Sequence, residues 1–139
     1  MGGGNDNYSS FKDFWSFDFD TMRWTALTAL PLATGGSAVA FDQKIYVFAD
    51  SGAVYVYDTV AGTWSTKKTG VKRSFSPACL VGTKAYFYGG IDSSNNAVNA
   101  DLWFYDLVAD VWMKVASGGA RRNGHSTINV GGKAFVYGG

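Results

Sequence analysis

The chain has 139 residues, of which 47% are hydrophobic, 17% aromatic and 17% charged, and its formal net charge is +1. This length fits one domain, and so apolar a composition with so few charges excludes an intrinsically disordered chain. The balanced charge gives no global attraction to nucleic acid, and no stretch approaches the roughly 20 apolar residues of a membrane span, so neither nucleic acid nor a membrane is an expected partner.

The first predicted elements are two short strands. Residues 13–18 form an aromatic-rich run that ends in Asp18, and Trp24 follows six residues later. Short aromatic and β-branched runs bounded by turn residues favour strands. No segment of ten or more residues has a convincing helical period, so an all-β chain is expected.

Two further units of four strands follow. In the first, the predicted strands cover residues 38–41, 44–48 and 53–58 and a segment around Trp64. In the second, they cover residues 78–81, 84–88 and 101–106 and a segment around Trp112. A last pair of strands is predicted at residues 127–130 and 133–137. We name the strands of one unit a, b, c and d in chain order.

The units share two fixed features. Strand c ends in an Asp, and a Trp on strand d follows after an interval of six residues in all three copies: Asp18 and Trp24, Asp58 and Trp64, Asp106 and Trp112. Strand b is closed by a glycine pair in two copies, Gly89-Gly90 and Gly138-Gly139. The Trp-to-Trp intervals of 40 and 48 residues match the period of a propeller blade, which is a four-stranded antiparallel sheet.

Each repeated residue has a structural explanation. Blades pack on both faces, so the central strands b and c are apolar throughout. The glycine pair permits positive φ and close backbone approach, and the Asp after strand c can accept hydrogen bonds from the next turn. The Trp offers a large apolar area, which we expect to pack against the next blade.

The repeat resembles the kelch motif, whose pattern is Arg-x-x-His before strand a, an aromatic strand b with Gly-Gly, an aromatic strand c with a terminal Asp, and a Trp on strand d. The last copy matches best, with Arg122, His125, Tyr137, Gly138 and Gly139. The resemblance implies a propeller fold and does not specify a ligand.

The other copies depart from the motif. The middle copy has Arg73 and the glycine pair, but Ser76 replaces the histidine. The first complete copy has Ala33 and Gly36 at the Arg and His positions and Ala49-Asp50 in place of the glycine pair.

We interpret residues 1–139 as a single kelch-repeat unit with two complete blades flanked by complementary half-blades. Their approximate limits are 2–28 for a half-blade, 29–68 and 69–116 for the blades, and 117–139 for the other half-blade. Three blade equivalents cannot close a ring, because propellers have about four to eight blades. A homodimer that forms a six-bladed ring through two hybrid blades is therefore expected.

The predicted function is a non-catalytic binding or scaffolding module that assembles with itself. The resemblance implies that the d–a and b–c loops share one face. The d–a loops carry six cations that could receive an acidic peptide or protein: Lys67, Lys68, Lys72, Arg73, Arg121 and Arg122. Long polar b–c loops are expected at residues 5–12 and 91–100.

Two alternatives remain at this point: a fragment of a larger propeller without independent activity, and, less favoured, a kelch-type propeller enzyme. No cofactor or metal is expected, since His125 and Cys79 are the only histidine and cysteine. His125 is expected to bond neighbouring backbone or a loop, and Cys79 to be a buried apolar side chain. Residues 1–5 lack a signal-peptide pattern, so a cytoplasmic location is expected.

Overall fold

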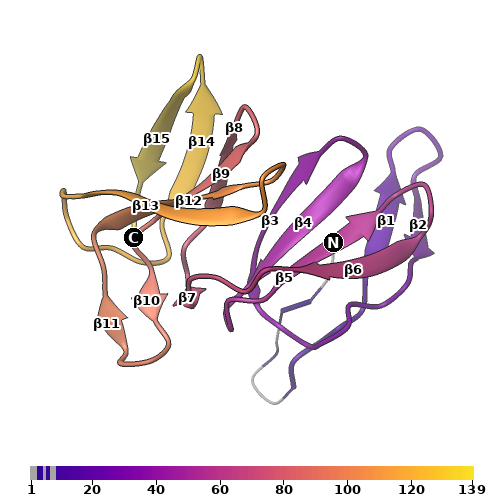
Figure 1. The fold of residues 1–139 in the computed structure, drawn as a ribbon. Coiled ribbons are helices and arrows are strands. Elements are labelled where there is room, and N and C mark those ends of the chain that lie inside the picture. Colours follow the sequence, from indigo (N-terminus) through magenta and orange to yellow (C-terminus); the bar gives the residue numbers. More distant parts are fainter. Residues whose placement is uncertain (1–2, 5, 7–8) are drawn as a thin grey trace.

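The computed structural model describes residues 3–4, 6 and 9–139, and these residues form only strands, turns and loops (Figure 1). The prediction of an all-β chain is confirmed. Among the described residues no helix is long and apolar enough to cross a membrane.

Two four-stranded antiparallel sheets make up the centre of the molecule. The first contains β3 (Gly36–Phe41), β4 (Lys44–Ala49), β5 (Val54–Asp58) and β6 (Thr63–Lys67). The second contains β8 (Ala78–Val81), β9 (Lys84–Tyr88), β12 (Asp101–Asp106) and β13 (Val111–Ser117). In both, the spatial order follows strands a, b, c and d, as the repeat predicts.

A two-stranded sheet lies on each side of this centre (Figure 1). One pairs β1 (Trp15–Asp18) with β2 (Arg23–Ala26), which are strands c and d. The other pairs β14 (Ser126–Val130) with β15 (Lys133–Tyr137), which are strands a and b. The a strands β3, β8 and β14 are neighbours, so the sheets are arranged around a common inner side.

The predicted Asp cap is present in all three copies. Asp58 Oδ1 accepts hydrogen bonds from the backbone N–H groups of Val60 and Ala61, both at 2.9 Å. Asp18 and Asp106 repeat the arrangement at 2.8 to 3.0 Å. These backbone N–H groups lower the pKa of each carboxyl from its ordinary value, because they stabilise its charged form.

The main core lies between the two complete blades. The ring of Phe48 packs edge-on against Phe87, with centroids 4.7 Å apart, and also contacts Tyr105 and Trp112. Val54 and Tyr105 are fully buried in the same cluster. Edge-to-face aromatic packing of this kind adds about 1 kcal/mol per pair to the burial of apolar area.

The strand-d tryptophans pack against the preceding blade, so our prediction of the next blade was wrong. Trp64 Nε1 donates to the carbonyl oxygen of Thr28 at 2.8 Å, and its ring lies 5.1 Å from Phe14 of the first half-blade. Trp112 Nε1 donates to Lys68 O at 3.4 Å. The sequence pattern does not show whether the tryptophan packs on the preceding or the next blade, because both blades offer an apolar face.

The ring of Trp112 covers Gly70 so closely that a Cβ at this residue would overlap the indole. Gly70→Ala should therefore lower the free energy of unfolding by about 1–3 kcal/mol, the usual cost of overpacking. Urea unfolding followed by fluorescence measures this, with Thr69→Ala at the exposed neighbour as the control. Equal stability of both variants would contradict this account of the joint between blades.

Candidate binding face

A small three-stranded sheet forms where the loops predicted to share one face meet. β7 (Arg73–Ser74), in a d–a loop, pairs with β10 (Ile91–Asp92), which pairs with β11 (Ala97–Val98). Residues 91–100, expected as an open polar loop, thus contain a hairpin. The polar sequence hid it, since its register depends on pairing with a strand about 18 residues away and not on an apolar face.

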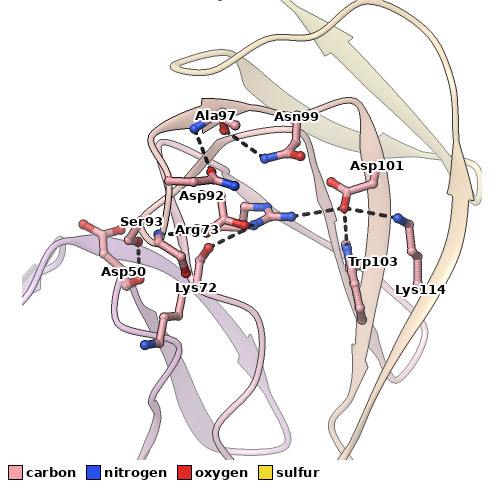
Figure 2. Close-up of polar contacts among 12 residues, drawn as sticks. Asp50, Lys72, Arg73, Asp92, Ser93, Ala97, Asn99, Asp101, Trp103 and Lys114 are labelled. Atoms are coloured by element: carbon pink, nitrogen blue, oxygen red, sulfur yellow. Dashed lines mark hydrogen bonds and ion pairs between the residues drawn. The ribbon is translucent and has the colours of Figure 1, made fainter.

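Arg73 holds this sheet to the blade (Figure 2). Its guanidinium forms ion pairs at 3.1 Å with both Asp92 and Asp101, and the Arg73 and Asp101 side chains are only 11% and 10% exposed. Asp101 also accepts a hydrogen bond from Trp103 Nε1 at 2.8 Å and lies 3.7 Å from the Lys114 ammonium. The Arg73 charge is therefore compensated within the chain and is not free for a partner.

The turn of the hairpin reaches the neighbouring blade. Asp92 Oδ1 accepts the backbone N–H of Ser94 at 2.9 Å, and this bond and Arg73 lower the pKa of the Asp92 carboxyl. The hydroxyl of Ser93 donates to the carbonyl oxygen of Asp50 at 3.2 Å (Figure 2). The hairpin thus connects the two complete blades at this face.

The other five predicted cations divide into two groups. Arg122 donates to Gly138 O at 2.6 Å, so its side chain supports the last glycine pair. Lys68, Lys72 and Arg121 are exposed, Lys67 is half-buried, and none of the four forms an ion pair with another described residue. These four lysine and arginine side chains remain available to solvent.

The pair Gly89-Gly90 allows the close approach that we predicted. Gly89 and Gly90 have φ of 64° and 81°. A Cβ on Gly89 would lie 2.5 Å from Arg122 O, and one on Gly90 would lie 2.7 Å from the Cβ of Ser76. Gly90 N–H also donates to Arg122 O at 2.9 Å. The pair therefore lets strand b, strand a and the next d–a loop meet without side chains between them.

A cavity of about 450 Å³ opens beside these loops. Its lining includes Asp50, Ser76 and His125. Within the described residues, Asp50 Oδ1 and both ring nitrogens of His125 are buried without a hydrogen-bond partner. The backbone bond that we expected for His125 is absent there, so that prediction was wrong.

The two titratable groups respond to this burial in opposite ways. Burial raises the pKa of the Asp50 carboxyl. Burial and the nearby Arg122 charge lower the pKa of His125, so its ring is neutral near pH 7. The sequence could have indicated this cavity, because Asp50 departs from the repeat at a position where the other copies have glycine.

The described residues contain no group of three or more His, Cys, Asp or Glu side chains placed to hold a metal ion. Cys79 is buried, as predicted, and burial raises the pKa of its thiol. A raised thiol pKa disfavours the nucleophilic thiolate.

A family model described as the KLHDC2/KLHL20/DRC7 Kelch-repeats domain matches residues 1–139. Kelch-like protein 25 of Xenopus laevis is 37% identical over 68 residues, covering 49% of this chain and 11% of that protein. The Rab9 effector protein with kelch motifs of Rattus norvegicus is 28% identical over 159 residues, covering 100% of this chain and 42% of that protein.

The fold is also similar to a solved structure, that of YjhT, with a TM-score of 0.72 and 24% sequence identity. This match covers 81% of the present chain and 36% of the YjhT chain. The chain therefore spans less than half the length of each of these proteins.

Replacing Arg73 should loosen the hairpin. In Arg73→Gln, Asp101 stays mostly buried and loses its strongest ion pair, so we expect a loss of about 3 kcal/mol in the free energy of unfolding. Amide hydrogen exchange at Ala97 should also accelerate. Lys72→Gln, at the exposed neighbour, should change stability by less than about 0.5 kcal/mol. Equal effects of the two variants would show that the ion pairs do not stabilise the face.

Proposed function

The chain belongs to the KLHDC2/KLHL20/DRC7 kelch-repeat family, and from this premise we propose that it is a non-catalytic binding module that assembles with itself. The name of one relative, the Rab9 effector protein with kelch motifs, describes an effector, which supports a role in protein recognition. A second copy of the chain is the first partner that we propose.

The exposure of strand β15 is the observation that carries this proposal. Tyr46 and Phe48 in β4 are each 5% exposed, whereas Phe135 and Tyr137, at the same positions in β15, are 52% and 66% exposed. Within the described part of the chain, β15 pairs only with β14 and leaves its outer edge open. An exposed apolar strand edge favours pairing with another strand.

The complementary edge belongs to β1, which pairs with β2 and with no other described strand. In both complete blades the first residue of strand b lies opposite the Asp that ends strand c: Lys44 opposite Asp58, and Lys84 opposite Asp106. Each lysine lowers the pKa of the Asp that it faces. The same register would place Lys133 of one copy opposite Asp18 of another, two exposed residues of opposite charge.

Trp24 supports the same arrangement. It is 53% exposed, because no strand of a preceding blade covers it among the described residues. Trp64 and Trp112 donate to the carbonyl four residues after the tryptophan of the preceding blade, at Thr28 and Lys68. The equivalent acceptor in a second copy would be Ala116 O.

The glycine beneath the tryptophan ring also recurs in the repeat. Gly70, which Trp112 covers, lies six residues after Trp64, and the residue six after Trp112 is Gly118. Nothing lies within 4 Å of a Cβ built on Gly118 among the described residues. We therefore propose that Trp24 of one copy packs over Gly118 of the other, which makes the joint two-fold symmetric.

Light scattering should give twice the chain mass of 14.9 kDa. Trp24→Ala should weaken the dimer at least about tenfold, as expected for a tryptophan at an interface centre. Met22→Ala, at a residue of the same hairpin that is 69% exposed, is the control. A wild-type monomer would contradict self-assembly and would favour the alternative that further blades of a longer chain cover these edges.

The register can be checked with a disulfide. With Cys79→Ala as background, the pair Ser16→Cys and Phe135→Cys should give a covalent dimer, because the register that we propose places these two residues opposite each other. Ser16→Cys with Ala134→Cys is the matched control, since neighbouring residues of a strand face opposite sides of the sheet. Equal crosslinking of both pairs would contradict the register.

An acidic peptide or protein is a second proposed partner. The supporting observation is that Lys68, Lys72 and Arg121 are exposed and form no ion pair with another described residue. Changing the three to Ser should weaken binding of a poly-aspartate peptide at low salt while leaving stability unchanged. High salt should weaken wild-type binding in the same way. Arg23→Ser, an exposed cation at the opposite turn, should have no effect, and an equal loss there would indicate unspecific attraction.

A further inference from the structure

The cavity beside the loop face is formed where the inner ends of three successive repeats meet. Gly36, Ser76 and His125 occupy the same position of the repeat, at or just before strands β3, β8 and β14. All three line the cavity of about 450 Å³. The fold thus brings one equivalent position from each repeat to a single site.

Asp50 occupies space that the side chain of Ser76 fills in the second complete blade. In the second complete blade, Gly90 faces Ser76 and leaves room for its side chain. In the first complete blade the arrangement is reversed. Gly36 stands at the position of Ser76, next to Gly35, and Asp50 stands at the position of Gly90. A Cβ on Gly35 would lie 2.7 Å from Asp50 Oδ2, so the glycine leaves room for the Asp50 carboxyl in its present position.

This exchange leaves a carboxylate without a counter-charge. Asp50 forms no ion pair with another described residue, and its Oδ1 is buried without a hydrogen bond. His125 is 5% exposed, and both of its ring nitrogens also lack partners among the described residues. Buried polar groups without partners destabilise a fold, and these two line a cavity in which a ligand could satisfy them.

The lining defines the chemistry of that ligand. The uncompensated carboxylate of Asp50 favours a cation with several N–H donors. A neutral His125 can accept one of those hydrogen bonds without charge repulsion. Phe75 and Pro77 supply apolar surface in the same cavity. Two titratable ligand residues are too few for a typical metal site, whereas they suit an ammonium group on an apolar stem.

We propose that this cavity binds a primary ammonium group on an aliphatic stem, such as a lysine side chain of a partner protein, with Asp50 as the counter-ion and His125 as a hydrogen-bond acceptor. The site goes beyond self-assembly and does not depend on a second copy, because one chain supplies every residue of the cavity. It also differs from the cationic loops, since it selects a positive group from the partner.

The single histidine makes the experiment direct, because its imidazole NMR signals need no assignment. N-acetyl-lysine methylamide should shift the His125 signals saturably, with a dissociation constant on the order of millimolar for so small a probe. N-acetyl-norleucine methylamide, which has the stem without the ammonium, should bind at least about tenfold more weakly. Equal responses to both probes, or no saturable shift with the lysine probe, would overturn the proposal.

Two variants at Asp50 separate binding from folding. Asp50→Asn should weaken the lysine probe about 10- to 100-fold, the usual effect of losing one charged hydrogen bond. Asp50→Ala should lose binding and yet raise the midpoint of urea unfolding, since it removes a carboxyl oxygen that is buried without a hydrogen-bond partner among the described residues. Asp42→Asn, in the turn at the far end of the same blade, is the control. An unchanged lysine response in either Asp50 variant would overturn the assignment.

Discussion

The contact of a strand-d tryptophan with the preceding blade is the interaction on which the rest of the structure depends. Trp64 and Trp112 each reach back across a blade joint, place the ring on the earlier unit and donate the indole N–H to its d–a segment. Each blade therefore needs the blade before it, and stability accumulates between neighbours as in other repeat proteins. Trp24, at the start of the series, keeps half of its surface exposed for the same reason.

Polar contacts fix the conformations of the turns and loops, whereas the apolar contacts hold neighbouring blades together. The c strands end in Asp18, Asp58 and Asp106. The hydrogen bonds that these carboxylates accept from backbone N–H groups lower their pKa from the ordinary value of 3.8. A carboxyl with a lowered pKa stabilises the fold above its ordinary pKa, and this contribution is lost as the pH falls through the lowered value. Arg73 fixes a loop in a similar way. Its ion pairs with Asp92 and Asp101 hold strands β7 and β10 of the face against β12.

Most of the fold follows from local sequence patterns, whereas most of the candidate sites do not. The strands were predictable to within about two residues, because each central strand is an apolar run bounded by turn residues. The hairpin of β10 and β11 was not, since Ile91 and Asp92 pair with Ser74 and Arg73 of a preceding loop. The burial of Arg73 was missed for the same reason, because its acidic partners come from distant segments.

The cavity illustrates how a repeat makes functional positions recognisable. Equivalent residues with a common structural role are alike in every copy, as the three Asp caps are, since the same turn must form each time. Gly36, Ser76 and His125 share a position and have no chemistry in common, so the fold does not require any one of them. Asp50 stands out further, because a glycine pair satisfies the same turn without burying a charge. We expect Asp50, which departs from its repeat, to lower stability; the ligand that we propose accounts for its presence, and the apolar joints between blades offset its cost.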